Sequence, residues 1–254
     1  MSQNLVLLER EKSAARLVIN RPEKRNPLSL EVCRILTSFL DKLAIDDEVK
    51  VLGVTSVGDI AFCSGSDLND VERMFNDPAF KTAIRADTMR FHETLRNFPK
   101  PTIAFVNGVC FGGGVTLCLD CDLSVASEKA VFGLPEIKYG IVPAYAGTAV
   151  LNSMQRRQAL WLILTGENIT AQEAYRYGLV NKVVPHEKLR DEEHRLYDLM
   201  SGYDLAALMA CKLHADDTLA FGYSGYAKSQ MASYKWEVET ERIKKRLGTF
   251  LKHK

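Results

Sequence analysis

The spacing of apolar residues along the N-terminal part of the chain changes from strand-like to helical and back. Short apolar runs at residues 6–8 and 16–19 flank a charged turn, which predicts a β-hairpin. From Leu28 the apolar positions recur at the helical period and predict a long amphipathic helix. Those positions are Val32, Ile35, Leu36, Phe39, Leu40 and Leu43. Residues 51–55 then predict a short buried strand.

The middle of the chain repeats this order of elements. Residues 67–97 are rich in charge, but Ile84, Phe91, Leu95 and Phe98 share one helical face, and the prolines at 99 and 101 end that pattern. Apolar runs at 102–106 and 123–126 predict strands on either side of a largely apolar helix at 113–119. Strand, helix and strand in this order predict a parallel sheet covered by helices.

The C-terminal part differs in composition from this α/β region. From residue 149 onward the pattern is mostly helical, with one strand-like insert at 180–184 and a basic amphipathic helix at 235–254. We therefore expect an α/β core over residues 1–195 and a helical C-terminal region over residues 196–254 that serves assembly.

The composition is that of an ordinary globular protein. Hydrophobic residues make up 46% and charged residues 26% of the 254 positions, which argues against disorder, collagen or a coiled coil. With 33 Lys and Arg against 32 Asp and Glu, the net charge of +1 provides no field for a polyanion, so we expect no nucleic-acid partner. The six cysteines lie in apolar runs, which predicts free thiols in a reducing compartment. The spacing of Cys118 and Cys121 suits a metal site, but no second pair accompanies them, so we interpret them as buried thiols.

No targeting or membrane segment is expected. The first ten residues lack a basic region followed by an apolar core. Residues 101–119 are uncharged, but Asn107 and four glycines divide them into two short apolar pieces, which predicts a buried strand, a glycine turn and a buried helix. We therefore expect a cytoplasmic protein with no membrane partner.

Two glycine-containing loops each follow a predicted strand and precede a helix. In the first, at 62–68, Asp67 also suits a helix N-cap. The second, at 108–114, matches neither nucleotide-binding glycine motif. Backbone N–H groups from two such loops, converging on one point, would form an oxyanion hole. Glu136 follows Pro135 at an ordinary helix start, and would take part in chemistry only if the fold brings it to that hole.

In order and spacing these motifs resemble the crotonase superfamily of enoyl-CoA hydratases and isomerases, over roughly residues 4–250. The residues that carry the likeness are Arg21-Pro22 and Asn26, then residues 61–68, then Asn107-Gly108, Gly112-Gly113-Gly114 and Cys121-Asp122, then Phe132, Pro135-Glu136, residues 140–143 and Gly147-Thr148. Further matches are residues 164–166, Ala171, Ala174, residues 178–180 and Val183-Val184. The resemblance implies a spiral core of repeated ββα units and a C-terminal helical region that builds homotrimers, often paired into hexamers.

The resemblance also implies an acyl-CoA thioester as substrate, with no cofactor besides the coenzyme A that the substrate carries, and no metal. It assigns the backbone N–H groups of Ser66 and Gly113 to the thioester oxygen, where charge develops as an enolate forms. It places two groups of residues along the coenzyme A moiety. These are the basic residues Lys24 and Arg25, near its phosphates, and the segment Ser64, Gly65, Ser66, Asp67, Leu68 and Asn69.

The chain departs from the hydratase pattern at one catalytic position. Hydratases of this superfamily usually carry two glutamates; Thr116 stands at the first position and Glu136 at the second. One carboxylate can still move a proton between carbons, so this pattern favours a Δ3,Δ2-enoyl-CoA isomerase with Glu136 as acid and base. Thr116 either contacts substrate or simply packs or bonds a carbonyl of its own helix.

Two further positions bear on specificity. Ala144 stands where some hydrolases, dehalogenases and isomerases of the superfamily have an acidic residue, which argues against those reactions. Tyr145 is large where the superfamily mostly has a small residue, so it narrows the acyl pocket, offers its phenol to the substrate, or only packs.

Three alternatives stay open beside the isomerase. One is an enoyl-CoA hydratase with altered activity. Another is a decarboxylase of a carrier-protein or coenzyme A thioester, to which the run at 138–140 bears a faint likeness. The third is a non-catalytic acyl-CoA binding protein. The five histidines lie outside the matched motifs and receive no role.

Overall fold

The computed structural model of this chain describes residues 5–221. By its internal contacts the chain divides into two compact units, Met1–Ser201 and Gly202–Lys254. All the described strands belong to the first unit, and the second contributes α9 (Leu205–Phe221) to the described part. Residue 195, where the sequence predicts a domain boundary, lies inside α8 (Leu189–Ser201). The basic helix predicted at 235–254 lies outside the described residues.

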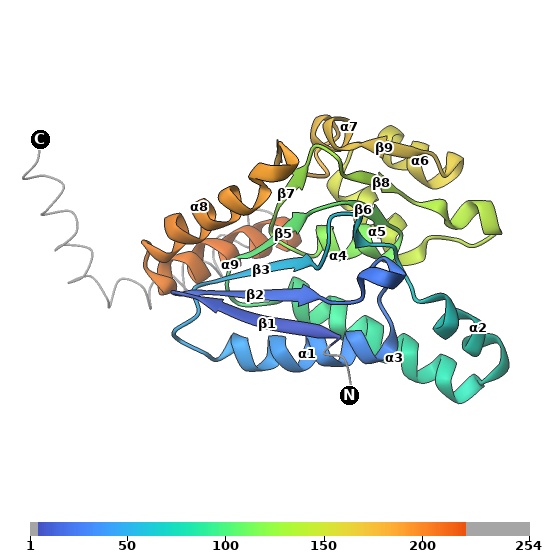
Figure 1. Cartoon of the computed structure of the whole chain (residues 1–254), viewed down its shortest axis with the longest axis horizontal. Helices are drawn as coiled ribbons and strands as arrows, with labels where there is room; N and C mark the ends of the chain where they lie inside the picture. The colour runs from blue at the N-terminus through green and yellow to red at the C-terminus, as the bar shows by residue number, and fades with distance from the viewer. Residues whose placement is uncertain (1–4, 222–254) are drawn as a thin grey trace, which may run out of the picture. The chain divides into compact units, whose positions relative to one another are not determined.

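The larger sheet of the first unit has six strands among the described residues (Figure 1). In spatial order they are β1 (Val6–Glu11), β2 (Ala14–Ile19), β3 (Val51–Ser56), β5 (Thr102–Val106), β7 (Leu123–Ser127) and β10 (Lys182–Val184). β1 and β2 form the predicted antiparallel hairpin, and every later neighbour is parallel. Each residue of β3 and β5 is buried, as expected for parallel strands covered on both faces. The predicted parallel sheet is thus confirmed.

A smaller sheet, which the apolar spacing did not predict, accompanies the larger one. Its strands among the described residues are β4 (Ala61–Cys63), β6 (Val109–Phe111), β8 (Val131–Gly133) and β9 (Asn168–Thr170). Each has three residues, too few for an alternating pattern to be recognised. The pairs β3–β4, β5–β6 and β7–β8 each give one strand to each sheet. This is the repeated ββα organisation that the resemblance implies.

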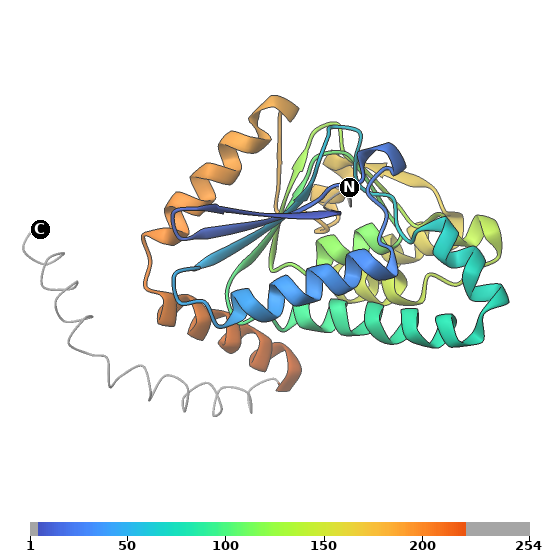
Figure 2. The same ribbon diagram turned by 60° about the horizontal axis from the view of Figure 1, so that its bottom comes forward.

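Helices cover the two faces of the larger sheet. α1 (Leu30–Ala44) and α3 (Pro78–Arg96) pack side by side against one face, and α8 covers the other (Figure 2). A Cβ atom at Gly53 of β3 would lie 1.7 Å from the Tyr197 hydroxyl of α8, so only glycine admits that phenol. Two apolar cores result, one on each face of the sheet.

The charged stretch at 67–97 forms two helices, α2 (Leu68–Asn76) and α3, although the apolar spacing indicates a single helical pattern. The break is local: the Asp77 carboxylate accepts a hydrogen bond from the Phe80 N–H at 2.9 Å, and Pro78 occupies the first turn of α3. The uncharged stretch at 101–119 forms β5, β6 and α4 (Gly113–Leu119). Across residues 5–221 no helix combines the length and the apolar character needed to cross a membrane.

Residues 149–221 are mostly helical, as predicted, and the helical part begins slightly earlier, at Ala144. α5 (Ala144–Ser153), α6 (Arg156–Thr165) and α7 (Ala171–Arg176) precede α8, and β9 is the strand that the pattern did not reveal. Short 3₁₀ helices occur at η1 (Pro22–Lys24), η2 (Pro135–Tyr139) and η3 (His186–Lys188). The six cysteines are free thiols, and all except Cys211 are buried. The turns η1 and η2 both lie near the short strands of the smaller sheet: Asn26, just after η1, donates to the Ala61 carbonyl of β4, and η2 follows β8 closely in the chain.

Candidate active site

The first glycine loop, residues 64–67, follows β4 and pairs with Leu28. The Leu28 N–H donates to the Gly65 carbonyl at 2.8 Å, and the Asp67 N–H donates to the Leu28 carbonyl at 3.0 Å. In a parallel bridge of this kind the residue between those two partners turns its own N–H away from the neighbouring segment. The N–H of the exposed Ser66 therefore points away from Leu28.

The second glycine loop, residues 111–114, leads from β6 into α4. Gly112 has a φ of +51°, a conformation that favours glycine, and its N–H donates to the Gly133 carbonyl at 3.0 Å. Gly113 is the first residue of α4, so its N–H has no acceptor within the helix. A Cβ atom at Gly114 would lie 2.3 Å from the Cys63 carbonyl oxygen, so glycine there allows α4 to pack directly on β4.

These two loops lie against one another. A Cβ atom built at Gly65 would be 3.6 Å from the Gly113 nitrogen, and one built at Gly113 would be 3.7 Å from the Gly65 Cα. The N–H groups of Ser66 and Gly113 thus belong to touching backbone segments that are far apart in the sequence. Such a pair of donors can serve a single carbonyl oxygen.

The carboxylate of Glu136, on η2, faces the second glycine loop. A Cβ atom at Gly112 would lie 2.6 Å from Glu136 Oε1, so the side chain occupies the space that glycine leaves. Glu136 is half-buried, and its Oε2 is buried without a hydrogen-bond partner among residues 5–221. Burial raises the pKa of this carboxyl above its ordinary value. The site therefore has a carboxylate with an unused lone pair, next to the glycine turn.

Asp67, by contrast, is buried and fully paired. Its Oδ2 forms an ion pair with Arg21 Nη2 at 2.6 Å, and its Oδ1 accepts the Asn69 N–H at 2.9 Å. The interpretation of Asp67 as the N-cap of α2 is confirmed, and the Arg21 partner is new. The next two residues, Leu68 and Asn69, are exposed on the first turn of α2. The Asp67 side chain therefore holds the loop in shape, while its neighbours remain accessible.

The basic loop, residues 21–28, lies beside the first glycine loop. Arg25 and Asn26 both have positive φ, +64° and +54°. The buried Asn26 supports this turn: its Oδ1 accepts the Arg21 N–H at 2.9 Å, and its Nδ2 donates to the carbonyls of Val57 and Ala61. Lys24 and Arg25 are consequently exposed, and neither forms an ion pair within the described part of the chain.

Ser64 connects the basic loop to the first glycine loop, because its N–H donates to the Arg25 carbonyl at 3.1 Å.

Thr116 lies one helical turn after Gly112, whose carbonyl accepts the Thr116 N–H at 3.3 Å. The Thr116 hydroxyl is buried and has no hydrogen-bond partner among the described residues, so a bond to a helix carbonyl, one of the three alternatives for this residue, is not present. Thr116 therefore leaves a second buried polar atom without a partner, near the turn that Glu136 faces.

Tyr145, in the first turn of α5, packs on a histidine that sequence reasoning left without a role. The rings of Tyr145 and His92 stack with centroids 5.8 Å apart. His92 is buried, its Nδ1 lies 2.6 Å from Asp120 Oδ2, and Arg96 Nη2 contacts the other oxygen of that carboxylate at 2.5 Å. These contacts agree with the packing interpretation of Tyr145. No sequence pattern predicts the contacts of His92 with Tyr145 and Asp120, because α3, α4 and α5 come together only in the folded chain.

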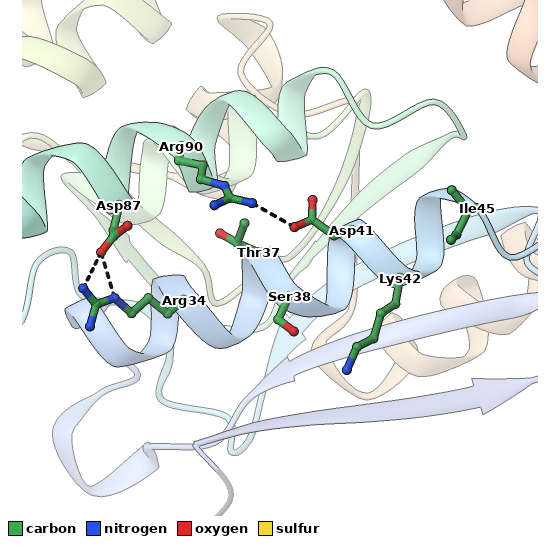
Figure 3. A pocket seen from close by; sticks show the side chains of 8 residues that line it. All are labelled: Arg34, Thr37, Ser38, Asp41, Lys42, Ile45, Asp87 and Arg90. Atoms are coloured by element: carbon green, nitrogen blue, oxygen red, sulfur yellow. Dashed lines mark hydrogen bonds and ion pairs between the residues drawn. The ribbon is translucent and has the colours of Figure 1, made fainter.

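A separate surface groove lies between α1 and α3 (Figure 3). Two of its arginines are neutralised by neighbouring carboxylates: Arg34 pairs with Asp87 at 2.7 Å and Arg90 with Asp41 at 3.1 Å. It shares no residue with the glycine loops or Glu136. The candidate site residues therefore lie at the loops and not in this groove.

Comparison with known proteins agrees with this arrangement. The sequence model described as enoyl-CoA hydratase/isomerase matches residues 9–251. The hydroxycinnamoyl-CoA hydratase-lyase of Pseudomonas fluorescens is 37% identical over 190 residues, which cover 73% of this chain and 68% of that protein. The short-chain-enoyl-CoA hydratase of Clostridium acetobutylicum is 36% identical over 190 residues, covering 74% and 72%.

Solved structures support the same assignment. The crystal structure of an enoyl-CoA hydratase from Bacillus anthracis superposes with a TM-score of 0.91 at 26% identity, covering 99% of this chain and 97% of that one. The human enoyl-CoA hydratase domain-containing protein 3 superposes with a TM-score of 0.89 at 27% identity, covering 97% and 98%. The expected crotonase-type fold is confirmed, and the chain belongs to the enoyl-CoA hydratase/isomerase family.

Proposed function

We propose that this protein moves the double bond of 3-enoyl-CoA thioesters to the 2-position. Glu136 carries the proton, and the N–H groups of Ser66 and Gly113 bind the thioester oxygen. The observation behind this proposal is the carboxylate of Glu136, which faces Gly112 and whose Oε2 has no hydrogen-bond partner within the described part of the chain. Membership of the enoyl-CoA hydratase/isomerase family also supports an acyl-CoA substrate.

The proposed reaction needs one proton carrier. The Glu136 carboxylate removes a proton from C2 of the acyl chain, and the electron pair spreads over the thioester oxygen and C4. Two N–H donors stabilise the negative oxygen as it forms. The protonated Glu136 then returns the same proton to C4, which leaves the double bond between C2 and C3. Its raised pKa makes the carboxylate a better base than an exposed glutamate.

The neighbouring groups favour this single-carboxylate route. The other carboxylate of the glycine loops, Asp67, is already bound to Arg21 and the Asn69 N–H. Thr116 stands at the position of the hydratases' first glutamate, and a hydroxyl does not act as a base near neutral pH. The proposal therefore gives both proton transfers to Glu136.

Hydration of a 2-enoyl thioester is the second candidate, because the relatives named above are called hydratases. In that reaction the unpartnered Thr116 hydroxyl and Glu136 Oε2 would both have to bind the attacking water. Coenzyme A would lie along Lys24, Arg25 and residues 64–69 in either case. A homotrimer or hexamer remains a prediction from the resemblance.

Product identification separates these functions. Purified protein is incubated with 3-enoyl-CoA, 2-enoyl-CoA and a 2-carboxyacyl-CoA, which can lose carbon dioxide to form a thioester enolate, and products are identified by mass and retention. Isomerisation converts the 3-enoyl thioester without a change of mass, hydration adds one water to the 2-enoyl thioester, and decarboxylation removes carbon dioxide from the third. Binding without turnover, seen as a thermal shift alone, would identify a non-catalytic protein.

A matched pair of variants tests the role of Glu136 in the same assay. Glu136→Gln keeps the shape of the side chain but removes its base, whereas Glu128→Gln changes an exposed carboxylate at the end of β7. We expect turnover to be lost in the first variant and kept in the second. Equal turnover in both would overturn the proposed proton carrier.

A further inference from the structure

An ion pair joins the basic loop to the first glycine loop. Arg21 Nη2 lies 2.6 Å from Asp67 Oδ2, and the two side chains are only 9% and 6% exposed. At this depth the pair is poorly screened by solvent, and loss of one partner leaves an uncompensated charge. Because Asp67 directly follows Ser66, the ion pair also bears on the position of the Ser66 N–H.

Arg21 also organises the basic loop itself. Its Nη1 donates to the Pro27 carbonyl at 3.2 Å, and its backbone N–H donates to Asn26 Oδ1 at 2.9 Å. The planar guanidinium thus holds the end of the basic loop and Asp67 at the same time. A lysine ammonium has no such fork geometry.

Backbone hydrogen bonds complete the connection between the two loops. The Ser64 N–H donates to the Arg25 carbonyl at 3.1 Å, the Leu28 N–H to the Gly65 carbonyl at 2.8 Å, and the Asp67 N–H to the Leu28 carbonyl at 3.0 Å. Residues 21–28 and 64–67 therefore form one hydrogen-bonded body. It carries the exposed side chains of Lys24 and Arg25 and also the Ser66 N–H, which points away from Leu28.

We propose that Arg21 is a positioning residue that couples phosphate binding at the basic loop to the placement of the Ser66 N–H. Phosphates of coenzyme A held by Lys24 and Arg25 would restrain the whole body and so fix the distance between the Ser66 and Gly113 donors. Binding energy at the nucleotide would then lower the barrier at the thioester. This inference rests on the proposed function and adds a role for a residue outside the catalytic set.

Substrate truncation measures the coupling. kcat and KM are determined for 3-enoyl-CoA and for the 3-enoyl thioester of pantetheine, which lacks the nucleotide and its phosphates. In the wild-type protein we expect kcat for the coenzyme A thioester to exceed that for the truncated thioester by about 10-fold to 100-fold, the size typical of a small misplacement of catalytic groups. Arg21→Met should bring this kcat ratio toward one, and Arg21→Lys should keep part of it.

Two further variants make the result specific. Lys24→Ala combined with Arg25→Ala changes only exposed side chains, so it tests the coupling even if Arg21→Met does not fold; its kcat ratio should also fall toward one. Arg16→Met removes another arginine that pairs with a buried carboxylate, Glu193 at 2.8 Å, away from the loops, and should keep the wild-type ratio. A general loss of stability would affect Arg16→Met as well.

The outcomes are distinguishable. If the wild-type protein converts neither thioester, the proposed function is wrong, and the coupling with it. If the protein is active but its kcat ratio is near one, or the ratio is unchanged in Arg21→Met and in the Lys24 and Arg25 double variant, the coupling is wrong and the proposed function stands. A change confined to KM would show that the phosphates only strengthen binding.

Discussion

The loop around Asp67 and the turn around Glu136 each bring a carboxylate to the glycine loops, but the two carboxylates have opposite surroundings. Asp67 is buried with an arginine on one oxygen and a backbone N–H on the other. Glu136 is half-buried, its Oε2 has no partner among the described residues, and burial raises its pKa.

This difference separates a structural carboxylate from one suited to proton transfer. The ion pair of Asp67 with Arg21 and its hydrogen bond from the Asn69 N–H hold the loop in position. Burial disfavours the charged form of Glu136, and its Oε2 has no partner among residues 5–221, so we propose this carboxylate as the group that accepts and releases a proton. Four experiments test this contrast.

Removing the base at Glu136 has the largest expected effect. Glu136→Gln should lower kcat for the 3-enoyl thioester by about 100-fold to 10,000-fold, the usual contribution of a general base. The amide keeps the volume of the side chain, so KM should change much less. Rate measurements at saturating substrate check this, and a decrease of only a few-fold would remove the distinction from Asp67.

Breaking the ion pair at Asp67 should chiefly affect stability. Asp67→Ala leaves Arg21 buried without its partner, and the free energy of unfolding should fall by about 3–5 kcal/mol. Denaturant titration measures this loss. The matched control is Asp191→Ala, which removes an exposed partner of Lys188 and should cost about 0–1 kcal/mol. Similar losses in both variants would contradict a structural role for Asp67.

Replacing the Thr116 hydroxyl should have a smaller effect of the opposite sign. Thr116→Val removes a buried oxygen without a partner and nearly preserves volume, so the free energy of unfolding should rise by about 1 kcal/mol. Thermal or denaturant unfolding tests this directly. A loss of stability would show that the hydroxyl has a partner, and a loss of 2-enoyl hydration in this variant would favour the hydratase candidate.

The pH dependence of stability should show the smallest effect. Burial raises the pKa of Glu136 in the folded protein above its unfolded value, so the folded state binds the proton more tightly. The contribution of Glu136 to stability is therefore full below the unfolded pKa and is lost as pH rises through the folded pKa. Relative to Glu136→Gln, the wild-type protein should lose stability across that window. Parallel pH profiles of the two unfolding midpoints would contradict the raised pKa.

Local patterns in the sequence predicted much of the framework. The hairpin, the amphipathic α1, the buried strands β3, β5 and β7, and the apolar α4 follow from apolar spacing alone. The two glycine loops were also recognisable, because each follows a buried strand and precedes a helix. The resemblance then supplied the family and the candidate roles of Ser66, Gly113 and Glu136, roles that remain proposals.

Contacts between distant segments decided the rest. The three-residue strands of the smaller sheet carry no period of their own and form only when neighbouring units pair. The partner of Asp67 is Arg21, and the partner of Tyr145 is His92; neither pair is adjacent in sequence. Apolar periodicity reports which face of an element is buried, so it predicted the longer helices and strands and their order, but not the three-residue strands or the break between α2 and α3. Which charges are neutralised, and which carboxylate oxygen has no partner among the described residues, depends on distances between segments that are far apart in the sequence, so these features follow from the tertiary structure.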